Sequence, residues 1–424
     1  MPSPNRTLNS TPSEASRAQW ILLALLVASV FINYIDRSNL SVSATDIIKE
    51  LGLTNIQMGQ LFSAFFLTYA ACQLLSGWLI DRFNVYVVFG VGFLLWSLAT
   101  AGTGLVHAFV PLLIARLILG LGESVAYPAY SKIFARDYKE SERGKANAFI
   151  DAGSKMGPAL GTFLGGMIVA EWGWRSLFLI LGLGALVWLP FWIIYTPRGH
   201  STQSLAVREM YVPSMLQMLR NRSVWGSFFG LFAINYAWYF MITWFPPYLE
   251  TARHFSKTKM AVLGSLPFVM LAISASVAGI VSDRLIANGN TPTRVRKTFI
   301  VTGLLLQTLL LPAGLAASDT VSMGLFLFAC FAFGLTTSNH WALTQTIAGP
   351  AAAGKWTGMQ NAFGNLAGLV APPLTGFIVD KTKSFDLAFV AVAITVVLGA
   401  LSYAFIIGRV EPVDWKPHTD LVRQ

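Results

Sequence analysis

Charged side chains are scarce in this sequence of 424 residues, of which Asp, Glu, Lys and Arg make up 12%. Soluble domains contain about 25% of these residues, so the composition argues against a soluble globular protein. Cysteine is almost absent, because only Cys72 and Cys330 occur, and both lie within apolar stretches. They indicate neither a disulfide framework nor a zinc site. The sequence also lacks an HExxH motif, clustered histidines and a serine nucleophile motif, which argues against a membrane-embedded enzyme.

Hydrophobic residues make up 54% of the chain. A helix that crosses a lipid bilayer needs about 20 mostly apolar residues, and the sequence contains twelve such stretches: 20–44, 57–80, 85–106, 109–135, 146–170, 174–195, 223–249, 259–283, 297–317, 320–347, 355–380 and 385–408. The 36 Gly and 19 Pro are compatible with membrane helices, whose neighbours satisfy the freed backbone groups. We therefore predict an all-α polytopic membrane protein of the cell inner (plasma) membrane, with twelve transmembrane helices.

The formal net charge is +10, but the basic residues lie in short clusters between apolar stretches, which does not indicate a nucleic-acid surface. If the N-terminus lies in the cytoplasm, 19 Lys and Arg residues fall on the cytoplasmic side and seven on the opposite side. Cytoplasmic loops of membrane proteins carry the excess of Lys and Arg. The charge pattern therefore predicts that both termini are cytoplasmic and that the number of spans is even.

The longest connection, 196–222, divides the chain into two sets of six apolar stretches. We predict two six-helix bundles, at 20–195 and 223–408, joined by a cytoplasmic linker at 196–222. Residues 1–19 are polar and lack the apolar run and cleavage site of a signal peptide. They are predicted to form a disordered cytoplasmic tail, and residues 409–424 are predicted to form a second cytoplasmic tail.

A short repeat marks corresponding places in the two halves. The second stretch ends in GWLIDRF and the eighth in GIVSDRL, so Gly, Asp and Arg stand at the same relative positions. The glycine allows close helix packing, and the Asp and Arg can pair with neighbouring loops at the cytoplasmic ends of the helices. We interpret the repeat as a motif that stabilises one conformation of a moving bundle, formed by Gly77, Asp81, Arg82, Gly279, Asp283 and Arg284.

Few ionisable residues lie inside the predicted spans, and a charge at the bilayer centre costs at least about 2.5 kcal/mol. Arg116 and Glu123 are seven residues apart and share one helical face, whereas the adjacent Asp36 and Arg37 point in different directions. One interpretation is that these four residues form buried ion pairs that fix helix register. The other is that Arg37 offers a planar, bidentate donor to a substrate carboxylate, while desolvation favours the protonated forms of Asp36 and Glu123.

Asp151 and Lys155 in the fifth span allow two interpretations. Their i,i+4 spacing, with the acid first, favours an ion pair within one helix. Alternatively, Lys155 joins Arg37 as a second cation, which would suit a substrate with two carboxylates. Both interpretations are compatible with the sequence.

The tenth span reads TTSNHWALTQ and the eleventh carries GMQNAFGNLAG, both unusually polar for contact with lipid. Ser338 and Trp341 share a helical face, and hydroxyl and amide groups beside an indole ring suit a polyhydroxylated or aromatic acid. Hydrogen bonding between helices is the alternative role for these groups. His340 is the one histidine inside a span, and it is a candidate either for ligand or proton binding or for packing. Tyr69, midway along the second span, is expected to line the same cavity.

The paired GWLIDRF and GIVSDRL segments, the long middle connection and the twelve stretches resemble the major facilitator superfamily. NYIDRSNLS at 33–41 and RLILGLGESVAYPA at 116–129 resemble its anion:cation symporter family more specifically. The resemblance implies that Asp36 and Glu123 are proton-coupling carboxylates. It also implies that Arg37 anchors the anion, that Arg116 is the partner of Glu123, and that substrate contacts include Tyr69, Trp341 and Asn361. The full predicted substrate-binding set is Arg37, Tyr69, Ser154, Lys155, Ser338, His340, Trp341 and Asn361.

These observations together predict a secondary transporter, not an enzyme, that takes up a small organic anion with protons by alternating access. A sugar acid such as a hexuronate, an aldonate or an aldarate is the first candidate substrate. Two alternatives stay open: an aromatic or other dicarboxylate such as phthalate or tartrate, and sodium-coupled or exchange transport. The predicted partners are the anion, protons and the lipid bilayer, with no cofactor, metal or nucleic acid. The chain is expected to act as a monomer.

Overall fold

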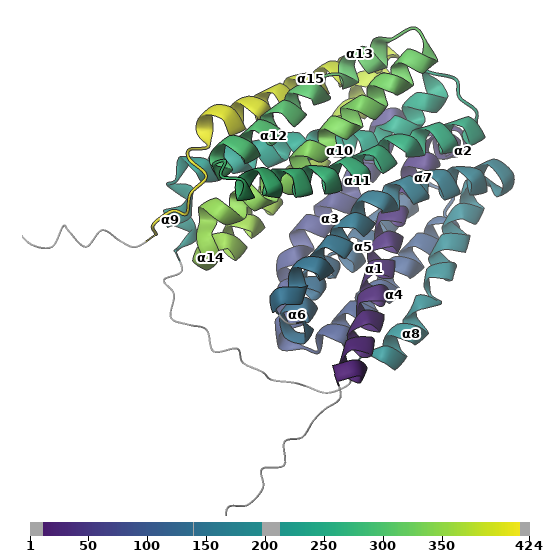
Figure 1. Cartoon of the computed structure of the whole chain (residues 1–424). Helices are drawn as coiled ribbons and strands as arrows, with labels where there is room; N and C mark the ends of the chain where they lie inside the picture. Colours follow the sequence, from purple (N-terminus) through teal and green to yellow (C-terminus); the bar gives the residue numbers. More distant parts are fainter. Residues whose placement is uncertain (1–11, 139, 197–212, 416–424) are drawn as a thin grey trace, which may run out of the picture.

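The computed structural model describes residues 12–138, 140–196 and 213–415, and the regular elements of these residues are all helices (Figure 1). The first part of the chain forms α1 (Pro12–Val42), α2 (Ala44–Leu51), α3 (Asn55–Arg82), α4 (Val85–Thr103), α5 (Phe109–Glu123), α6 (Ala126–Asp137), α7 (Glu140–Ala185) and α8 (Trp188–Tyr195). The second part forms α9 (Met215–Leu219), α10 (Arg222–Thr251), α11 (Lys257–Ala287), α12 (Pro292–Gln307), α13 (Leu310–Leu315), α14 (Asp319–Thr382), α15 (Asp386–Leu401) and a π-helical turn (Ser402–Ile406). The predicted all-α fold is confirmed.

Ten helical segments of the described residues are long and apolar enough to cross a membrane. The longest, 146–195, covers 50 residues and is interrupted at Gly173, where φ is 78° and ψ is 166°. α14 is interrupted in the same way at Gly349, with φ of 67°. Glycine adopts such positive φ values without steric cost, so each of these glycines ends one helix and begins another. α3, with 28 residues, packs beside these segments against α5 and α14.

The helices form two groups that follow the order of the chain. Figure 1 shows the helices of the first part, coloured purple to teal, gathered beside those of the second part, coloured teal through green to yellow. Within the first group α1 packs against α7 and α3 against α5, and within the second group α10 and α12 pack against α14. Across the boundary, α3 lies against α14, α7 against α11 and α1 against α10. A ligand at this boundary would therefore contact helices of both groups.

α1 and α7 approach each other closely because glycines of α7 face α1. A Cβ added at Gly157 would lie 2.4 Å from Tyr34 Cβ. One added at Gly161 would lie 3.0 Å from Ile35 Cα. Small residues at four-residue spacing let membrane helices pack tightly. This contact fixes the position of the ionisable residues of α1 relative to those of α7.

The N-terminal boundary differs from the prediction of a disordered tail up to residue 19. α1 begins at Pro12, so residues 12–19 are helical. Proline is tolerated in the first turn of a helix, and the following SEASRAQ contains neither glycine nor a further proline. Residues 1–11 lie outside the described part of the chain. Of the predicted linker at 196–222, residues 197–212 also lie outside it, and the short helix α9 precedes α10.

The described part of the C-terminal tail packs against the second group of helices. The Val413 amide donates a hydrogen bond to the Ile347 carbonyl at 2.9 Å. The Trp415 indole donates to the Ala348 carbonyl, also at 2.9 Å. The last carbonyls of a helix have no partner within that helix, and both acceptors stand just before the break at Gly349. The tail therefore caps the helical segment that ends there.

Gly157→Ala should destabilise the protein, because the added Cβ would overlap Tyr34 at the contact between α1 and α7. Overpacking costs about 1–3 kcal/mol, so we expect the melting temperature in detergent to fall by several degrees, followed by tryptophan fluorescence. Gly184→Ala is the control, since Gly184 lies in the helix that follows the break at Gly173 and no atom of another helix lies within 4 Å of its added Cβ. Equal melting temperatures for the two variants would contradict the close contact.

Candidate functional site

A cavity of about 470 Å³ lies at the boundary between the two groups of helices. Its lining comes from α1, α3, α6 and α7 on one side and from α10, α11 and α14 on the other. Charged, hydroxyl, amide and indole side chains are all present, including Tyr34, Arg37, Tyr69, Tyr127, Asn147, Asp151, Ser154, Lys155, Asn235, Trp238, Tyr239, Thr337, His340, Trp341, Gln345, Asn361 and Asn365. The cavity can therefore hold a small polar ligand and form hydrogen bonds with it from both sides.

Arg37 of α1 lies on the cavity wall inside a cage of aromatic rings. Its guanidinium carbon is 4.6 Å from the ring centre of Tyr34, 4.7 Å from that of Tyr69 and 4.9 Å from that of Phe65. Aromatic faces attract a guanidinium through cation–π interactions. Arg37 Nε also donates to Glu123 Oε2 at 3.0 Å, and the two side chains are 9% and 0% exposed. The positive charge at the cavity wall is therefore balanced by a fully buried carboxylate.

This ion pair differs from the predicted one, in which Arg116 is the partner of Glu123. In the described part of the chain, no ion pair joins Arg116 to an acid, and its guanidinium carbon lies 5.4 Å from the ring centre of Phe65. Arg116 and Glu123 share a face of α5 but stand about 10 Å apart along its axis. α1, in contrast, brings Arg37 directly against Glu123. In this conformation the direct ion pair of Glu123 is therefore with Arg37, and the coupling role of Arg116 remains a prediction.

Asp36 lies behind the cavity wall, next to the pair of Arg37 and Glu123. It is buried and accepts a hydrogen bond from Asn39 Nδ2 at 3.2 Å. Adjacent residues diverge by about 100° around a helix, which explains why Arg37 reaches the cavity and Asp36 does not. Asp36 Oδ2 and Glu123 Oε1 have no partner in hydrogen-bonding geometry among the described residues. A buried carboxylate with an unpaired oxygen is suited to take up a proton.

Lys155 and Asp151 of α7 form the ion pair that their i,i+4 spacing favours. Lys155 Nζ lies 2.6 Å from Asp151 Oδ1 and donates to Ser154 Oγ at 3.2 Å. Both residues of the pair line the cavity, and their side chains are 17% and 52% exposed, respectively. Ser154, which was predicted to bind substrate, also lines the cavity and donates to the Asp151 carbonyl at 2.7 Å. Of the two interpretations of the sequence, the structure shows the ion pair.

His340, Trp341 and Asn361, all predicted to bind substrate, line the wall formed by α14. His340 Nδ1 lies 3.1 Å from the Thr336 carbonyl, which can only accept, so Nδ1 carries a hydrogen. In the neutral ring Nε2 is then an acceptor, and it has no partner among the described residues. Within those residues, no Lys, Arg, Asp or Glu of the second group lines the cavity. The two walls therefore differ: the first carries charged pairs and the second carries hydrogen-bonding groups.

Ser338 does not line the cavity, in contrast to its predicted role in substrate binding. Its Oγ donates to the Ala275 carbonyl at 2.9 Å and so joins α14 to α11. Residues three apart differ by about 60° around a helix, and this difference is enough to turn Ser338 toward α11 while Trp341 faces the cavity. Gly279 of α11 leaves room for the contact, because a Cβ there would lie 3.5 Å from Ser338. Ser338 therefore has the alternative role of hydrogen bonding between helices.

Several aromatic and amide residues of the cavity are missing from the predicted set. The hydroxyls of Tyr34 and Tyr127 lie 3.1 Å apart and join α1 to α6. Tyr239 of α10 donates to Asn365 of α14. Tyr34 stands three residues before Arg37 and shares its helical face, which is the signal that identifies it from sequence. Asn365 follows Asn361 by four residues and shares its helical face, whereas Tyr239 has no such signal, because no charged residue marks the inward face of α10.

The two GxxxDR motifs differ in this structure. In the second copy, Asp283 lies 3.0 Å from Arg296 Nη2, and Arg296 also donates to Asn339 Oδ1 at 3.3 Å. These contacts link α11, α12 and α14, as expected for an acid that pairs with a neighbouring segment. In the first copy, no described atom lies within 4 Å of a Cβ added at Gly77, so the predicted close packing is not observed. The side chain of Asp81 lies outside the described part of the structure.

One end of the molecule, here called the closed end, holds residues 41–58, 243–259 and 368–386 and joins the two groups of helices. Asp380 of α14 accepts hydrogen bonds from the first two backbone amides of α3, at 3.1 and 2.8 Å, and from the Asn55 side chain at 2.7 Å. The first amides of a helix lack partners within it and favour a negative charge. The Asp380 carboxylate thus caps a helix of the opposite group.

Lys257 of α11 forms a second set of contacts at the closed end. Its Nζ lies 2.7 Å from Asp46 Oδ2 and 2.6 Å from Glu250 Oε2. It also donates to Thr45 Oγ1 at 2.7 Å. Because Thr45 and Asp46 belong to α2 and Glu250 belongs to α10, this one ammonium group holds segments of both groups together.

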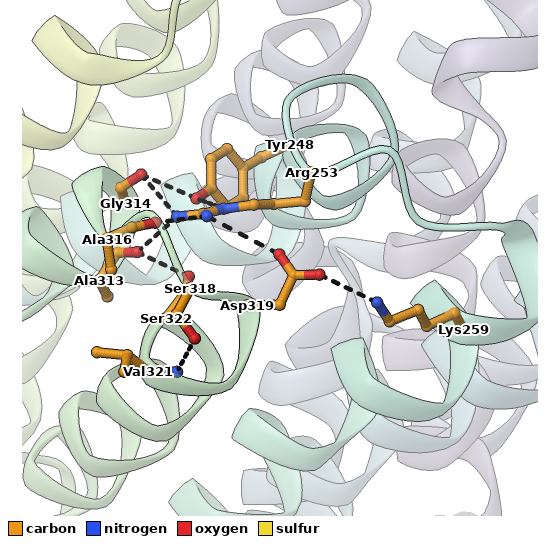
Figure 2. A network of polar contacts seen from close by, with 10 residues as sticks. All are labelled: Tyr248, Arg253, Lys259, Ala313, Gly314, Ala316, Ser318, Asp319, Val321 and Ser322. Carbon is orange, nitrogen blue, oxygen red and sulfur yellow. Dashed lines mark hydrogen bonds and ion pairs between the residues drawn. The ribbon is translucent and has the colours of Figure 1, made fainter.

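Figure 2 shows how the loops of the second group are fixed at the closed end. Arg253 donates to three backbone carbonyls of the 313–316 segment, at 2.6 to 3.1 Å, and to the Tyr248 hydroxyl at 2.6 Å. Asp319 lies between Arg253 and Lys259, at 3.9 and 3.1 Å. A guanidinium with several acceptors is held in one orientation, so this network connects the ends of α10, α11, α13 and α14.

Comparisons with known proteins agree with this architecture. Residues 26–370 match the family described as Major Facilitator Superfamily. The chain belongs to this superfamily. The predicted resemblance is confirmed, and the chain is a multi-pass transporter of the inner membrane, not an enzyme.

Three relatives from bacteria are similar over nearly the whole chain. The probable L-galactonate transporter of Escherichia coli K12 is 31% identical and is matched over 96% of this chain and 93% of its own length. The probable galactarate/D-glucarate transporter GudP of Bacillus subtilis 168 is 29% identical, with 96% of both chains covered. The hexuronate transporter of Bacillus subtilis 168 is 30% identical, with 94% of this chain and 96% of its own covered.

The fold is similar to that of a solved transporter. This is the crystal structure of a bacterial homolog to the human lysosomal transporter Spinster, in an inward-facing and occupied conformation. The TM-score is 0.78 at 19% sequence identity, and 92% of this chain and 96% of the other are covered. The similarity therefore extends over the helical architecture of the whole chain.

Asp380→Ala should weaken the closed end, because it removes the carboxylate that caps α3 from the opposite group. Hydrogen bonds to a charged group are worth about 1.5–3 kcal/mol, so we expect the population that is open at this end to rise about tenfold. The measurement is the distance distribution between spin labels at Lys49 and Ala252, which are exposed on opposite groups at this end. Cys72 and Cys330 are first replaced by Ala.

Asp386→Ala is the matched control for this experiment. Asp386 is exposed at the same end and forms no side-chain hydrogen bond or ion pair with the described residues of the first group. Its distance distribution should equal that of the unmodified protein. A distribution for Asp380→Ala that also remains unchanged would show that the cap does not hold the two groups together.

Proposed function

We propose that the protein carries a sugar acid into the cell together with a proton, by alternating access. The observation that most directly supports this proposal is the buried ion pair of Arg37 and Glu123 at the cavity wall. The cation that would bind a substrate carboxylate is held by a carboxylate of the protein. A proton on Glu123 releases Arg37 for the substrate. Loss of that proton returns Arg37 to Glu123, and the anion leaves.

Asp36 and Arg116 complete the coupling site in this proposal. Both interact electrostatically with Glu123, so the buried cluster contains two acids and two bases. With all four ionised, the cluster is neutral, which limits the cost of burying it in the membrane. One proton leaves a single positive charge, and a bound carboxylate restores neutrality. Proton and anion therefore stabilise each other in the cavity.

The proposed substrate class rests on relatives and on the cavity wall. The three relatives described above are named as transporters of galactonate, of galactarate and glucarate, and of hexuronate. His340, Asn361 and Tyr69 offer hydrogen bonds to the hydroxyls of such a chain, and Trp341 offers a flat apolar face. Arg37 is the proposed partner of the carboxylate. A polyhydroxylated monoacid or diacid fits this set better than a purely apolar anion.

The proposed topology has twelve crossings in two six-helix bundles. The ten apolar segments become eleven when α3 is added. They become twelve when the 146–195 segment is divided at Gly173. The excess of Lys and Arg in the connections supports a cytoplasmic location of both termini. The closed end then faces outward, and the cavity is reached from the cytoplasm. Because one chain supplies both walls of the cavity, a monomer is sufficient for transport.

The proposal is tested in liposomes that contain a pH-sensitive dye. Addition of sugar acids outside should acidify the interior without sodium, and Arg37→Ala should abolish this response because the anion loses its partner. Glu123→Gln mimics the protonated acid, so it should lose acidification but retain exchange of labelled substrate against unlabelled substrate. This pattern separates loss of coupling from loss of binding.

Two surface variants serve as controls, because Arg294→Ala and Glu411→Gln remove the same charges from exposed positions. Both should acidify the interior at the unmodified rate. Uptake that requires sodium, or normal acidification by Glu123→Gln, would show that the coupling assignment is wrong. A response to aromatic dicarboxylates but not to sugar acids would show that the substrate assignment is wrong.

A further inference from the structure

The number of carboxylates that the cavity accepts depends on its cations. Arg37 and Lys155 are the Arg and Lys side chains that line it among the described residues. The relatives described above are named for acids of both kinds, since galactonate has one carboxylate and galactarate has two. Membership of the superfamily therefore does not determine how many carboxylates the substrate has. The residues around Lys155, the second cation of the cavity, bear on that number.

We propose that Asp151 makes the site selective for sugar acids with a single carboxylate, because it holds the charge of Lys155. This inference rests on the proposed function and concerns the same cavity. Lys155 Nζ lies 2.6 Å from Asp151 Oδ1 and donates a further hydrogen bond to Ser154 Oγ. The ammonium group is therefore neutralised within its own helix and is occupied before any ligand binds.

The pair is held in place by the helix that carries it. Asp151 and Lys155 are one turn apart on α7, the spacing and order at which an acid and a base meet on a helix surface. α7 is itself packed against α1 through the contact of Gly157 with Tyr34. If a ligand displaced Asp151 from Lys155, the Asp151 carboxylate would remain next to the bound ligand, because both side chains belong to the same helical turn.

A second carboxylate would find no free positive partner in the cavity. Tyr34 and His340 are the titratable neighbours of Lys155 on α1 and α14, and in their neutral forms they add no charge. The second wall contributes no Lys or Arg among the described residues. Asp151 is 52% exposed, so its own charge faces the space that a second carboxylate would enter. Like charges at short range repel each other, and an unpaired charge in this site is costly.

Glu123, the partner of Arg37, and Asp151, the partner of Lys155, therefore have different roles in this proposal. Glu123 is fully buried and belongs to the cluster with Asp36 and Arg116, where a proton can release Arg37. Asp151 stands apart from this cluster, on another helix, and remains with Lys155. One proton at Glu123 thus frees one cation for one carboxylate.

The test uses two ligands that differ only at one chain end. Galactonate and galactarate share their carbon chain and hydroxyl configuration, but galactarate carries a carboxylate at both ends. In proteoliposomes, exchange of labelled galactonate is inhibited by either unlabelled acid, and the ratio of the two inhibition constants is measured. The gluconate and glucarate pair is measured in the same way.

For the unmodified protein, we expect the monoacid to inhibit at least about tenfold more strongly than the diacid. Asp151→Asn frees Lys155 and should improve the relative inhibition by the diacid about tenfold, with little change for the monoacid. Asp151→Glu retains the charge and should retain the selectivity. Asp151→Asn combined with Lys155→Met should lose the gain, because the freed cation is then absent.

Three results would overturn the proposal: equal inhibition by both acids in the unmodified protein, an unchanged ratio in Asp151→Asn, or a retained gain for the diacid when Asp151→Asn is combined with Lys155→Met. The last would show that the freed Lys155 is not the partner of the second carboxylate. Melting temperatures of all variants exclude misfolding as the cause. If the unmodified protein exchanges and binds neither pair of acids, the proposed function is wrong, whereas equal inhibition contradicts only the selectivity.

Discussion

The ion pair between Arg37 and Glu123 is the interaction on which the site depends. A charge buried in a membrane protein is stable only with a partner, so this pair holds α1 and α5 in register and keeps the guanidinium among its aromatic neighbours. Because each of these buried charges needs a partner, the pair can take part in the proposed transport. When Glu123 takes up a proton, Arg37 loses its negative partner. A substrate carboxylate that binds Arg37 then takes the place of the Glu123 carboxylate. In the proposed mechanism, proton and anion are therefore linked by electrostatics, without a moving part between them.

Helix packing transmits this local exchange to the rest of the molecule. The glycine contact between α7 and α1 places the two ion pairs of the first wall on helices that cannot slide apart independently. Contacts between the two groups at the closed end include polar, reversible ones, because Asp380 and Lys257 each hold segments of both groups. Tight packing within a group and reversible polar contacts between groups suit two bodies that rock against each other.

Much of this arrangement follows from the sequence because its causes are local. Apolar length predicts the helices, and the high cost of buried charge singles out Asp36, Arg37 and Glu123 as important. The ion-pair partner of Glu123 depends on distances between helices, which the sequence does not encode locally, so the direct contact with Arg37 does not follow from the face that Arg116 and Glu123 share. Asp380 has no local signal at all, because it caps amides that are 324 and 325 residues away along the chain.

Residues 413–415, which follow α15 and the π-helical turn, have a structural task. Val413 and Trp415 supply the hydrogen bonds that the carbonyls of residues 347 and 348 lack, since the helix is broken at Gly349. The free carbonyls at this helix end thus obtain their hydrogen-bond donors from residues 413 and 415. The ribosome adds these residues after the described helices have been made. The hydrogen bonding at this helix end is complete only when translation has passed Val413 and Trp415.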